Sequence, residues 1–235
     1  MNYNVTYIEH SCFLVETAEC YLLFDYYGGE VPLPALDPAK PLLLFSSHAH
    51  HDHFSKEIFA LRDRYPSAVF VLSADIPVPA TVQPFTCPML PHEHRLLPLA
   101  GGRGTVSIET LRSNDEGVAF IIRLGDLCIY HAGDLNNWWW DGDVEDQKLA
   151  DIYHEELERI RGQHFTVAFI PLDPRLKGWW KGIEDFMHYA DADAIFPMHN
   201  FGEKGLPKKF LTLDCAAGYK SRVFDVEEPL TSWEL

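Results

Sequence analysis

This chain of 235 residues lacks long apolar segments and has few positive charges. No run approaches the ~20 apolar residues that a membrane helix needs, and no basic segment with an apolar signal core opens the sequence. Its 19 lysines and arginines face 35 aspartates and glutamates, which gives a formal net charge of -16 without a basic stripe. The missing apolar segments lead us to expect a cytoplasmic protein without a membrane as partner. Because the negative charge repels polyanions, we expect no long nucleic acid as partner either.

Cysteine is also scarce, and its spacing excludes a scaffold built on sulfur. The five cysteines are odd in number and scattered, and no two form a CxxC pair. Neither a disulfide framework nor a thiolate zinc ribbon is therefore indicated. An apolar fraction of 47% without repeats or low-complexity linkers predicts a single domain over residues 1–235.

Predicted strands and helices interleave along the whole chain. Strands are expected at 5–8, 12–16, 21–25, 42–46, 68–72, 105–111, 118–124, 127–131, 167–170 and 194–197. Helices are expected at 55–65, around 147–162 and at 183–190, and the proline-rich stretches 31–41, 76–91 and 171–174 are expected to be loops. This alternation favours a layered α/β architecture.

One short segment carries most of the chemistry. His48, His50, Asp52 and His53 follow directly on a predicted buried strand. His48 and His50 occupy alternate positions of an extended chain, so their side chains face the same side. A turn into the next helix can bring Asp52 and His53 to a neighbouring position. Imidazole with carboxylate is typical of zinc, manganese or iron, and the absence of thiolates favours a catalytic site. The alternative is a solvated, histidine-rich loop.

This segment and four further stretches give the chain a specific resemblance. His48-x-His50-x-Asp52-His53 resembles the signature of the metallo-β-lactamase fold superfamily. The stretch 129–134 resembles the strand and turn that present the family's bridging aspartate, and 196–199 resembles the loop of its last histidine. The stretches 7–11 and 22–25 resemble the opening strands of the branch that includes L-ascorbate-6-phosphate lactonase-like proteins.

The resemblance implies a fold and a ligand set. The fold is a four-layer αββα sandwich of two mixed β-sheets flanked by helices, with the metals at one edge. One metal position would use His48, His50 and a further histidine, and Asp134 would lie between it and the second position. The second position would use Asp52, His53 and His199. His10 and Asp25 become candidates for supporting the ligands or lining the substrate pocket.

The chain departs from the family pattern at the further histidine, because the stretch 111–117 contains none. Asp115 can serve as an oxygen ligand, Ser113 or Asn114 can hold a water, or His131 can turn inward. The sequence leaves these alternatives open, and with them the choice between one and two metal ions.

The resulting hypothesis is a metal-dependent hydrolase that uses a metal-bound hydroxide on a small-molecule ester, lactone, thioester or phosphate ester. A bound metal lowers the pKa of its water to about 7, and zinc is expected ahead of manganese or iron. Asp134 would orient the hydroxide and Asp52 would assist proton transfer to the leaving group. One alternative is a metal-containing binding or sensing module, and another is iron-based redox chemistry. A homo-oligomer is compatible with the sequence.

Several other residues carry weaker signals. The tryptophans at 138–140 and 179–180 can wall a substrate pocket or belong to the core. Arg175, Lys177 and Lys181 can neutralise a phosphate or carboxylate, or simply be solvated. His51 is expected to point away from its neighbours, and His92 is not expected to bind metal.

Overall fold

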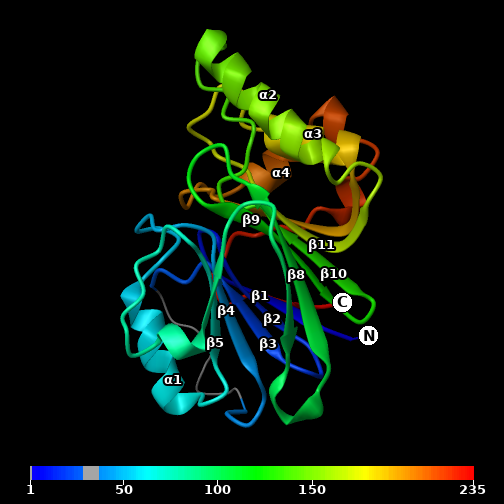
Figure 1. Ribbon diagram of the computed structural model, residues 1–235. Helices are drawn as coiled ribbons and strands as arrows, with labels where there is room; N and C mark the ends of the chain where they lie inside the picture. The colour runs from blue at the N-terminus through cyan, green and yellow to red at the C-terminus, as the bar shows by residue number, and fades with distance from the viewer. Residues whose placement is uncertain (1, 29–36) are drawn as a thin grey trace.

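The computed structural model describes residues 2–28 and 37–235, in which two β-sheets lie face to face (Figure 1). Sheet A has the strand order β13-β1-β2-β3-β4-β5-β6 and sheet B the order β12-β11-β10-β9-β8-β7. The strands of sheet A are β1 (Asn4–Glu9), β2 (Cys12–Glu16), β3 (Tyr21–Phe24), β4 (Leu42–Ser46), β5 (Val69–Ser73), β6 (Thr86–Met89) and β13 (Ser232–Glu234). The strands of sheet B are β7 (His94–Pro98), β8 (Thr105–Arg112), β9 (Val118–Leu124), β10 (Leu127–His131), β11 (His164–Pro171) and β12 (Asp191–Met198).

Both sheets are mixed. In sheet A the pairs from β3 to β6 are parallel, whereas β1 pairs antiparallel with β2 and β13. In sheet B the pairs from β10 to β12 are parallel and the rest are antiparallel. The parallel strands β3 and β4 are apolar along almost their whole length, which suits strands that are buried on both faces.

The main core fills the space between the sheets. Side chains alternate along each strand, so Phe13 of β2 faces inward while its neighbour Leu14 faces the other side of sheet A. The rings of Phe13 and Phe169 lie 4.5 Å apart, and those of Phe45 and Phe120 lie 5.4 Å apart. Each of these pairs joins one sheet to the other, so a continuous aromatic layer holds them together.

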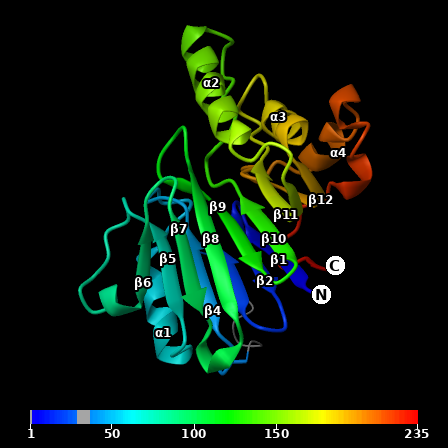
Figure 2. The ribbon, with the colours of Figure 1, turned by 45° about the vertical axis from the view of Figure 1, so that its right-hand side comes forward.

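Helices cover the outer faces of both sheets. The helices are α1 (Leu61–Arg64), α2 (Val144–Glu158), α3 (Lys181–Tyr189) and α4 (Leu206–Phe210), with a 3-10 helix η2 at Lys56–Ala60 ahead of α1. Ile58 and Tyr65 pack on the outer face of sheet A, while α2, α3 and α4 gather beyond sheet B (Figure 2). The expected four-layer sandwich is therefore confirmed. In the described parts of the chain, no helix is both long and apolar enough to cross a membrane.

The stretch 55–65 is helical as expected, with Ser55 as the cap of a 3-10 helix that a single α-turn follows. Other expectations about local structure were wrong. The proline-rich loop at 76–91 contains β6, which tolerates Pro88 because it forms the edge of sheet A. The strands β7 and β13 were not expected at all. Helix α2 begins before the expected region, because Asp143 caps it by accepting from two backbone N–H groups. Of the loop expected at 31–41, residues 31–36 lie outside the described residues.

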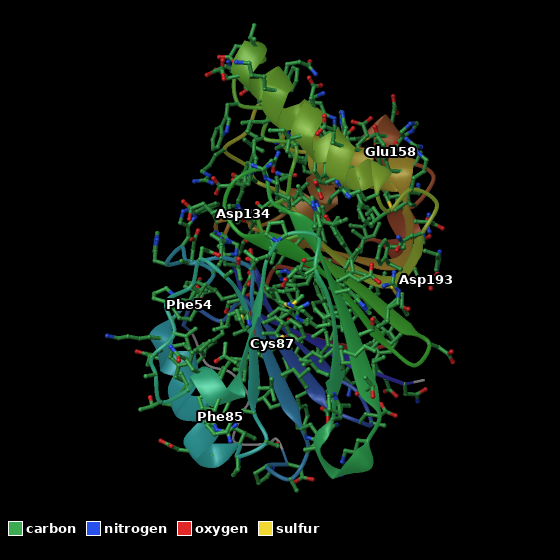
Figure 3. The ribbon with its side chains drawn as sticks, in the orientation of Figure 1. Phe54, Phe85, Cys87, Asp134, Glu158 and Asp193 are labelled. Atoms are coloured by element: carbon green, nitrogen blue, oxygen red, sulfur yellow. The ribbon has the colours of Figure 1, made fainter. Side chains whose placement is uncertain are left out.

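The topology brings several chain segments to one end of the sandwich. The parallel strands β10, β11 and β12 end side by side, and the segment after β4 and the β1–β2 and β8–β9 turns meet them there. Figure 3 places Asp134, just after β10, where the sheets meet the helical part of the molecule. This end of the sandwich carries the candidate site.

Candidate metal centre

The ligand segment after β4 is fixed through Ser47, which is fully buried. Its backbone N–H and its hydroxyl donate to the two carboxylate oxygens of Asp25, at 2.7 and 2.8 Å. Its carbonyl oxygen accepts the N–H of Val118 at 2.9 Å. Since the Ser47 hydroxyl donates to Asp25, it accepts from His48 Nδ1 at 3.0 Å, which leaves His48 Nε2 free to coordinate.

Two glycines allow neighbouring turns to approach this serine. Gly117 and Gly133 have φ angles of 72° and 53°, in the left-handed region that favours glycine. A Cβ on Gly117 would overlap the Ser47 carbonyl oxygen, and one on Gly133 would lie 2.6 Å from Ser47 Cβ. The turns that carry Asp115 and Asp134 therefore pack against the ligand segment because these positions have no side chain.

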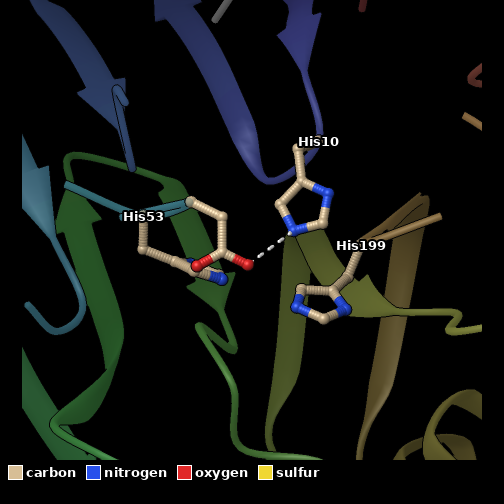
Figure 4. Close-up of side chains that lie close together, drawn as sticks. His10, His53 and His199 are labelled. Carbon is tan, nitrogen blue, oxygen red and sulfur yellow. Dashed lines mark ion pairs between the residues drawn. The ribbon is translucent and has the colours of Figure 1, made fainter. Parts of the chain in front are cut away.

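Eight side chains form two adjacent groups of potential ligands. The first, the His53 group, consists of His10, Asp52, His53 and His199 (Figure 4). The second, the His48 group, consists of His48, His50, Asp115 and Asp134. Within each group the potential ligand atoms all lie within 4.8 Å of one another.

The Asp134 carboxylate lies between the two groups. Its Oδ1 lies 3.1 Å from His53 Nε2 and 3.4 Å from His199 Nε2, while its Oδ2 lies 3.6 Å from His48 Nε2. Because each oxygen faces a different group, this carboxylate has the arrangement of a bridging ligand.

His10 joins the His53 group from the β1–β2 turn. Its Nε2 lies 3.5 Å from Asp52 Oδ2, the ion pair drawn as a dashed line in Figure 4, and its ring centroid lies 4.3 Å from that of His199. His10, Asp25 and His199 all have positive φ angles, which are uncommon for residues with a side chain. Such local strain is typical of functional sites.

Asp115, one of the candidates for the ligand that the sequence lacks, belongs to the His48 group. Its Oδ2 lies 3.7 Å from His50 Nδ1, and Glu116 Oε2 lies 3.4 Å from His50 Nε2. The other candidates have different partners. Asn114 uses its amide group to bond the backbone of Asn136 and Leu149, and the Ser113 hydroxyl accepts from the N–H of Asp115.

His131 lies in the core. Its Nε2 donates to the carbonyl oxygen of Ser11 at 3.1 Å, and its Nδ1 accepts the N–H of Gly133 at 3.2 Å. The ring stacks on Phe24 with centroids 4.9 Å apart. With both nitrogens engaged, His131 supports the β10 turn and is absent from both groups of potential ligands.

Buried carboxylates orient the histidines of the His53 group. His53 Nδ1 donates to Asp25 Oδ2 at 2.7 Å, and His199 Nδ1 lies 3.3 Å from Asp173 Oδ2. Both carboxylates are fully buried. This is the usual arrangement for a metal-binding histidine, whose second nitrogen is held by a carboxylate. Sequence reasoning missed Asp173, although its position just after a buried parallel strand was a signal for it.

The charges of the site are strongly coupled. Burial lowers the pKa of His48 to about 4, with a further contribution from His53. Burial also opposes the charged form of His53, but the carboxylates of Asp134 and Asp25 outweigh it and raise the pKa of His53 well above its usual value. Burial raises the pKa of Asp115 and the Asp134 carboxylate adds to this, whereas the histidines around Asp134 outweigh burial and lower its pKa.

The donor atoms fit divalent metal ions. Among the described residues, His10 Nε2, His48 Nε2, His53 Nε2 and Asp134 Oδ1 are buried without a hydrogen-bond partner. Buried polar atoms are rarely left unsatisfied, so four such atoms around one point indicate a missing cation. Nitrogen and carboxylate ligands suit zinc, manganese or iron.

The sequence matches the model of the beta-lactamase superfamily domain over residues 4–154. The chain belongs to this family. It is 29% identical over 210 residues to a "UPF0173 metal-dependent hydrolase" of Opitutus terrae, an alignment that covers 83% of this chain and 78% of the relative. These matches confirm the resemblance that the ligand motif indicated.

Solved structures share the fold of this chain. Igni18, described as a novel metallo hydrolase from the archaeon Ignicoccus hospitalis, superposes with a TM-score of 0.64 at 18% identity, over 100% of this chain and 99% of that one. CmlA, a diiron β-hydroxylase from Streptomyces venezuelae, gives a TM-score of 0.53 at 15% identity, over 84% of this chain and 44% of that one.

A cavity of about 500 Å³ opens beside the two groups of potential ligands. Trp138 and Trp140 line it together with Arg175, whereas Trp179 and Trp180 pack against the core. Both alternatives expected for the tryptophans therefore occur: Trp138 and Trp140 line a cavity, and Trp179 and Trp180 belong to the core.

The remaining candidates lie apart from the ligand groups. Lys177 pairs with Asp141 at 2.6 Å, and Lys181 lies over the ring of Trp139 at 4.5 Å. The side chain of His51 is 99% exposed, and its Nδ1 lies 3.9 Å from Asp52 Oδ1. His92 Nε2 lies 2.9 Å from Glu156 Oε1 and belongs to neither group of potential ligands.

Proposed function

We propose that this protein is a metal-dependent hydrolase of a small-molecule ester, lactone, thioester or phosphate ester. The observation that carries the proposal is the pair of ligand groups that share the Asp134 carboxylate, with three histidine nitrogens left buried and unpaired. The hydrolase names of relatives at 29% identity support it.

The metals would be held by the His53 group and the His48 group. Bound there, they would make a hydroxide available at neutral pH and polarise the scissile carbonyl or phosphoryl group. Asp134 would orient the attacking water through the carboxylate that faces both groups. Asp52 would pass a proton to the leaving group, since a carboxylate oxygen that is not bound to metal can hold a proton.

The two groups differ in their preference for metal. The His53 group offers three imidazoles and one carboxylate, a set that suits zinc. The His48 group offers two imidazoles and two carboxylates, and the larger share of oxygen favours a harder ion such as manganese or iron(II). We therefore assign Asp115 the ligand role that a histidine usually has in this family.

Metal content and hydrolysis, measured together, test the proposal. Elemental analysis of protein purified without added metal or chelator should give about two metals per chain, and Asp115→Ala should reduce this to about one. His92→Ala is the matched control, because this histidine belongs to neither group of potential ligands and does not line the cavity beside them.

The same preparations should hydrolyse at least one member of a panel of esters, lactones, thioesters and phosphodiesters, and lose this activity when the metal is removed. Unchanged hydrolysis by metal-free protein would contradict the proposal. Absence of hydrolysis across the panel in protein with two metals would favour a binding or sensing module.

The carboxylate-rich His48 group also favours a second candidate, oxygen-dependent chemistry at iron. CmlA, which has this fold, is a diiron enzyme by its description. Two iron ions per chain in the purified protein, together with oxygen consumption in place of hydrolysis, would support this candidate. Zinc or manganese in both positions would exclude it.

A further inference from the structure

Arg175 lies at the boundary between two cavities that flank the ligand groups. The cavity of about 500 Å³ is lined by Trp138, Trp140 and Arg175, and a second of about 620 Å³ by Tyr27, Phe201 and Arg175. Both are also lined by Asp52 and His51, so they meet over the site. A substrate bound in either cavity therefore has this guanidinium on its wall.

The guanidinium is held firmly in this place. Its Nε and Nη2 donate to the carboxylate of Asp173, with the shortest contact at 2.6 Å, and its face lies 3.8 Å from the ring centroid of Phe201. Within the described residues, no hydrogen bond involves Nη1. One edge of the planar fork is therefore fixed by the protein, while the other is available to a ligand.

Neutralising Asp173 alone does not explain this arrangement. Asp173 is fully buried and needs a counter-charge, yet the side chain of Arg175 is 47% exposed and opens into both cavities. Of the described residues that line the 500 Å³ cavity, Arg175 is the one with a permanent positive charge. Lys177 and Lys181, on the same segment, are engaged with Asp141 and with the ring of Trp139.

Beside the guanidinium is a flat apolar wall. The ring of Trp140 lies 5.5 Å from Arg175 Cζ and is nearly parallel to that of Trp138, at 10° and 6.1 Å between centroids. Trp138 is fixed by a hydrogen bond from its Nε1 to the carbonyl oxygen of Asp134, whereas Trp140 is 39% exposed. Aromatic faces of this kind bind ring systems or other flat apolar groups.

We propose that Arg175 binds an oxyanion of the substrate, a carboxylate or a phosphate, while a ring or flat apolar part of the same molecule packs against Trp140. This inference rests on the proposed function, since it assigns a substrate class to the same site. The substrate would then be an anionic, ring-bearing ester, lactone or thioester, or a phosphate ester, with its scissile bond over Asp134.

Two small probes that differ in charge test the proposal without turnover. Benzenesulfonate presents a ring with an oxyanion that binds metals weakly, and methyl phenyl sulfone presents the same ring without charge. In titration calorimetry, protein with its metals bound should prefer benzenesulfonate by about 10-fold, the effect of one good charge-assisted contact. Arg175→Gln should remove this preference, and Trp140→Ala should weaken the binding of both probes.

Lys177→Gln is the matched control, because it removes a positive charge from the same segment but outside the cavities. It should retain the full preference. Arg175→Lys keeps the counter-charge of Asp173 but not the planar fork, so its preference should fall between those of the wild type and Arg175→Gln. Equal affinity of the wild type for both probes, or an undiminished preference in both Arg175 variants, would overturn the proposal.

A second series identifies the oxyanion. Benzoate and phenylphosphonate should both lose affinity in Arg175→Gln, and the larger loss marks the group that the site prefers. Because binding is measured apart from hydrolysis, an Arg175-dependent preference in a protein without hydrolytic activity would refute the proposed function alone. Hydrolysis with no Arg175-dependent preference would refute this inference alone.

Discussion

The two ligand groups that share Asp134 differ in how firmly the fold holds them. In the His53 group three histidines are buried, and the carboxylates of Asp25 and Asp173 orient two of them. In the His48 group the side chains of His50 and Asp115 are 43% and 45% exposed, on the rim of a cavity. A buried, oriented set of ligands loses less freedom on binding metal, so we expect the His53 group to bind more tightly.

The largest effect is expected for a variant that weakens metal binding in both groups. Asp134→Ala deletes the carboxylate that both groups share, so elemental analysis should find both positions depleted of metal. Hydrolysis should fall by more than ~100-fold, because residues that merely orient metal ligands already cost 10–100-fold.

Asp126→Ala is a suitable control, since it removes an exposed carboxylate from the turn that leads into β10. It should leave metal content and hydrolysis unchanged. Full metal content in Asp134→Ala would show that the two groups do not depend on this carboxylate, and the assignment of a bridging ligand would be wrong.

A smaller effect is expected for a variant that weakens metal binding in the His53 group alone. Asp173→Asn weakens the support of His199 but touches no ligand of the His48 group. One of two metals should then bind about 10–100-fold more weakly, while the other keeps its affinity. Competition with a chromophoric chelator resolves the two steps.

Asp141→Asn provides the comparison, because Asp141 also pairs with a cation but lies in solvent. It should leave both affinities as they are. An equal loss at both metals in Asp173→Asn would mean that the groups are coupled beyond Asp134.

The sequence indicated more of the two groups of potential ligands than of the residues around them. The spacing of His48, His50, Asp52 and His53 determines their relation locally, because all four belong to one strand end and the turn that follows it. Their supports come from distant parts of the chain. Asp173 becomes relevant only because β11 lies between β10 and β12, a pairing that no local pattern specifies.

The missed elements of the fold have a related cause. The strand β7 is largely exposed and β6 contains a proline, so neither has the alternation of a half-buried strand. The strand β13 has three residues and exists through its pairing with β1, more than 200 residues away in sequence. Central strands such as β4, by contrast, are apolar along their length and were predicted correctly.

The smallest expected effect is a difference between the two groups in the number of protons that are released when metal binds. In the metal-free protein the raised pKa of His53 keeps this histidine protonated at neutral pH, whereas His48, with a pKa of about 4, is already neutral. A histidine must lose its proton to coordinate, so metal binding to the His53 group should release about one proton at pH 7. Calorimetric titrations in buffers of different ionisation enthalpy measure this number.

The sign of the pH dependence follows from the direction of these shifts. Below the raised pKa of His53, the affinity of the tighter position should increase about tenfold for each pH unit, and above that pKa it should level off. In the weaker position His48 is neutral above about pH 4, so this histidine should contribute no such dependence near neutrality. His51→Ala should release the same number of protons as the wild type, because its imidazole is solvated. If no proton were released at pH 7, His53 would already be neutral before the metal binds, and the carboxylates of Asp25 and Asp134 would not keep it protonated at that pH.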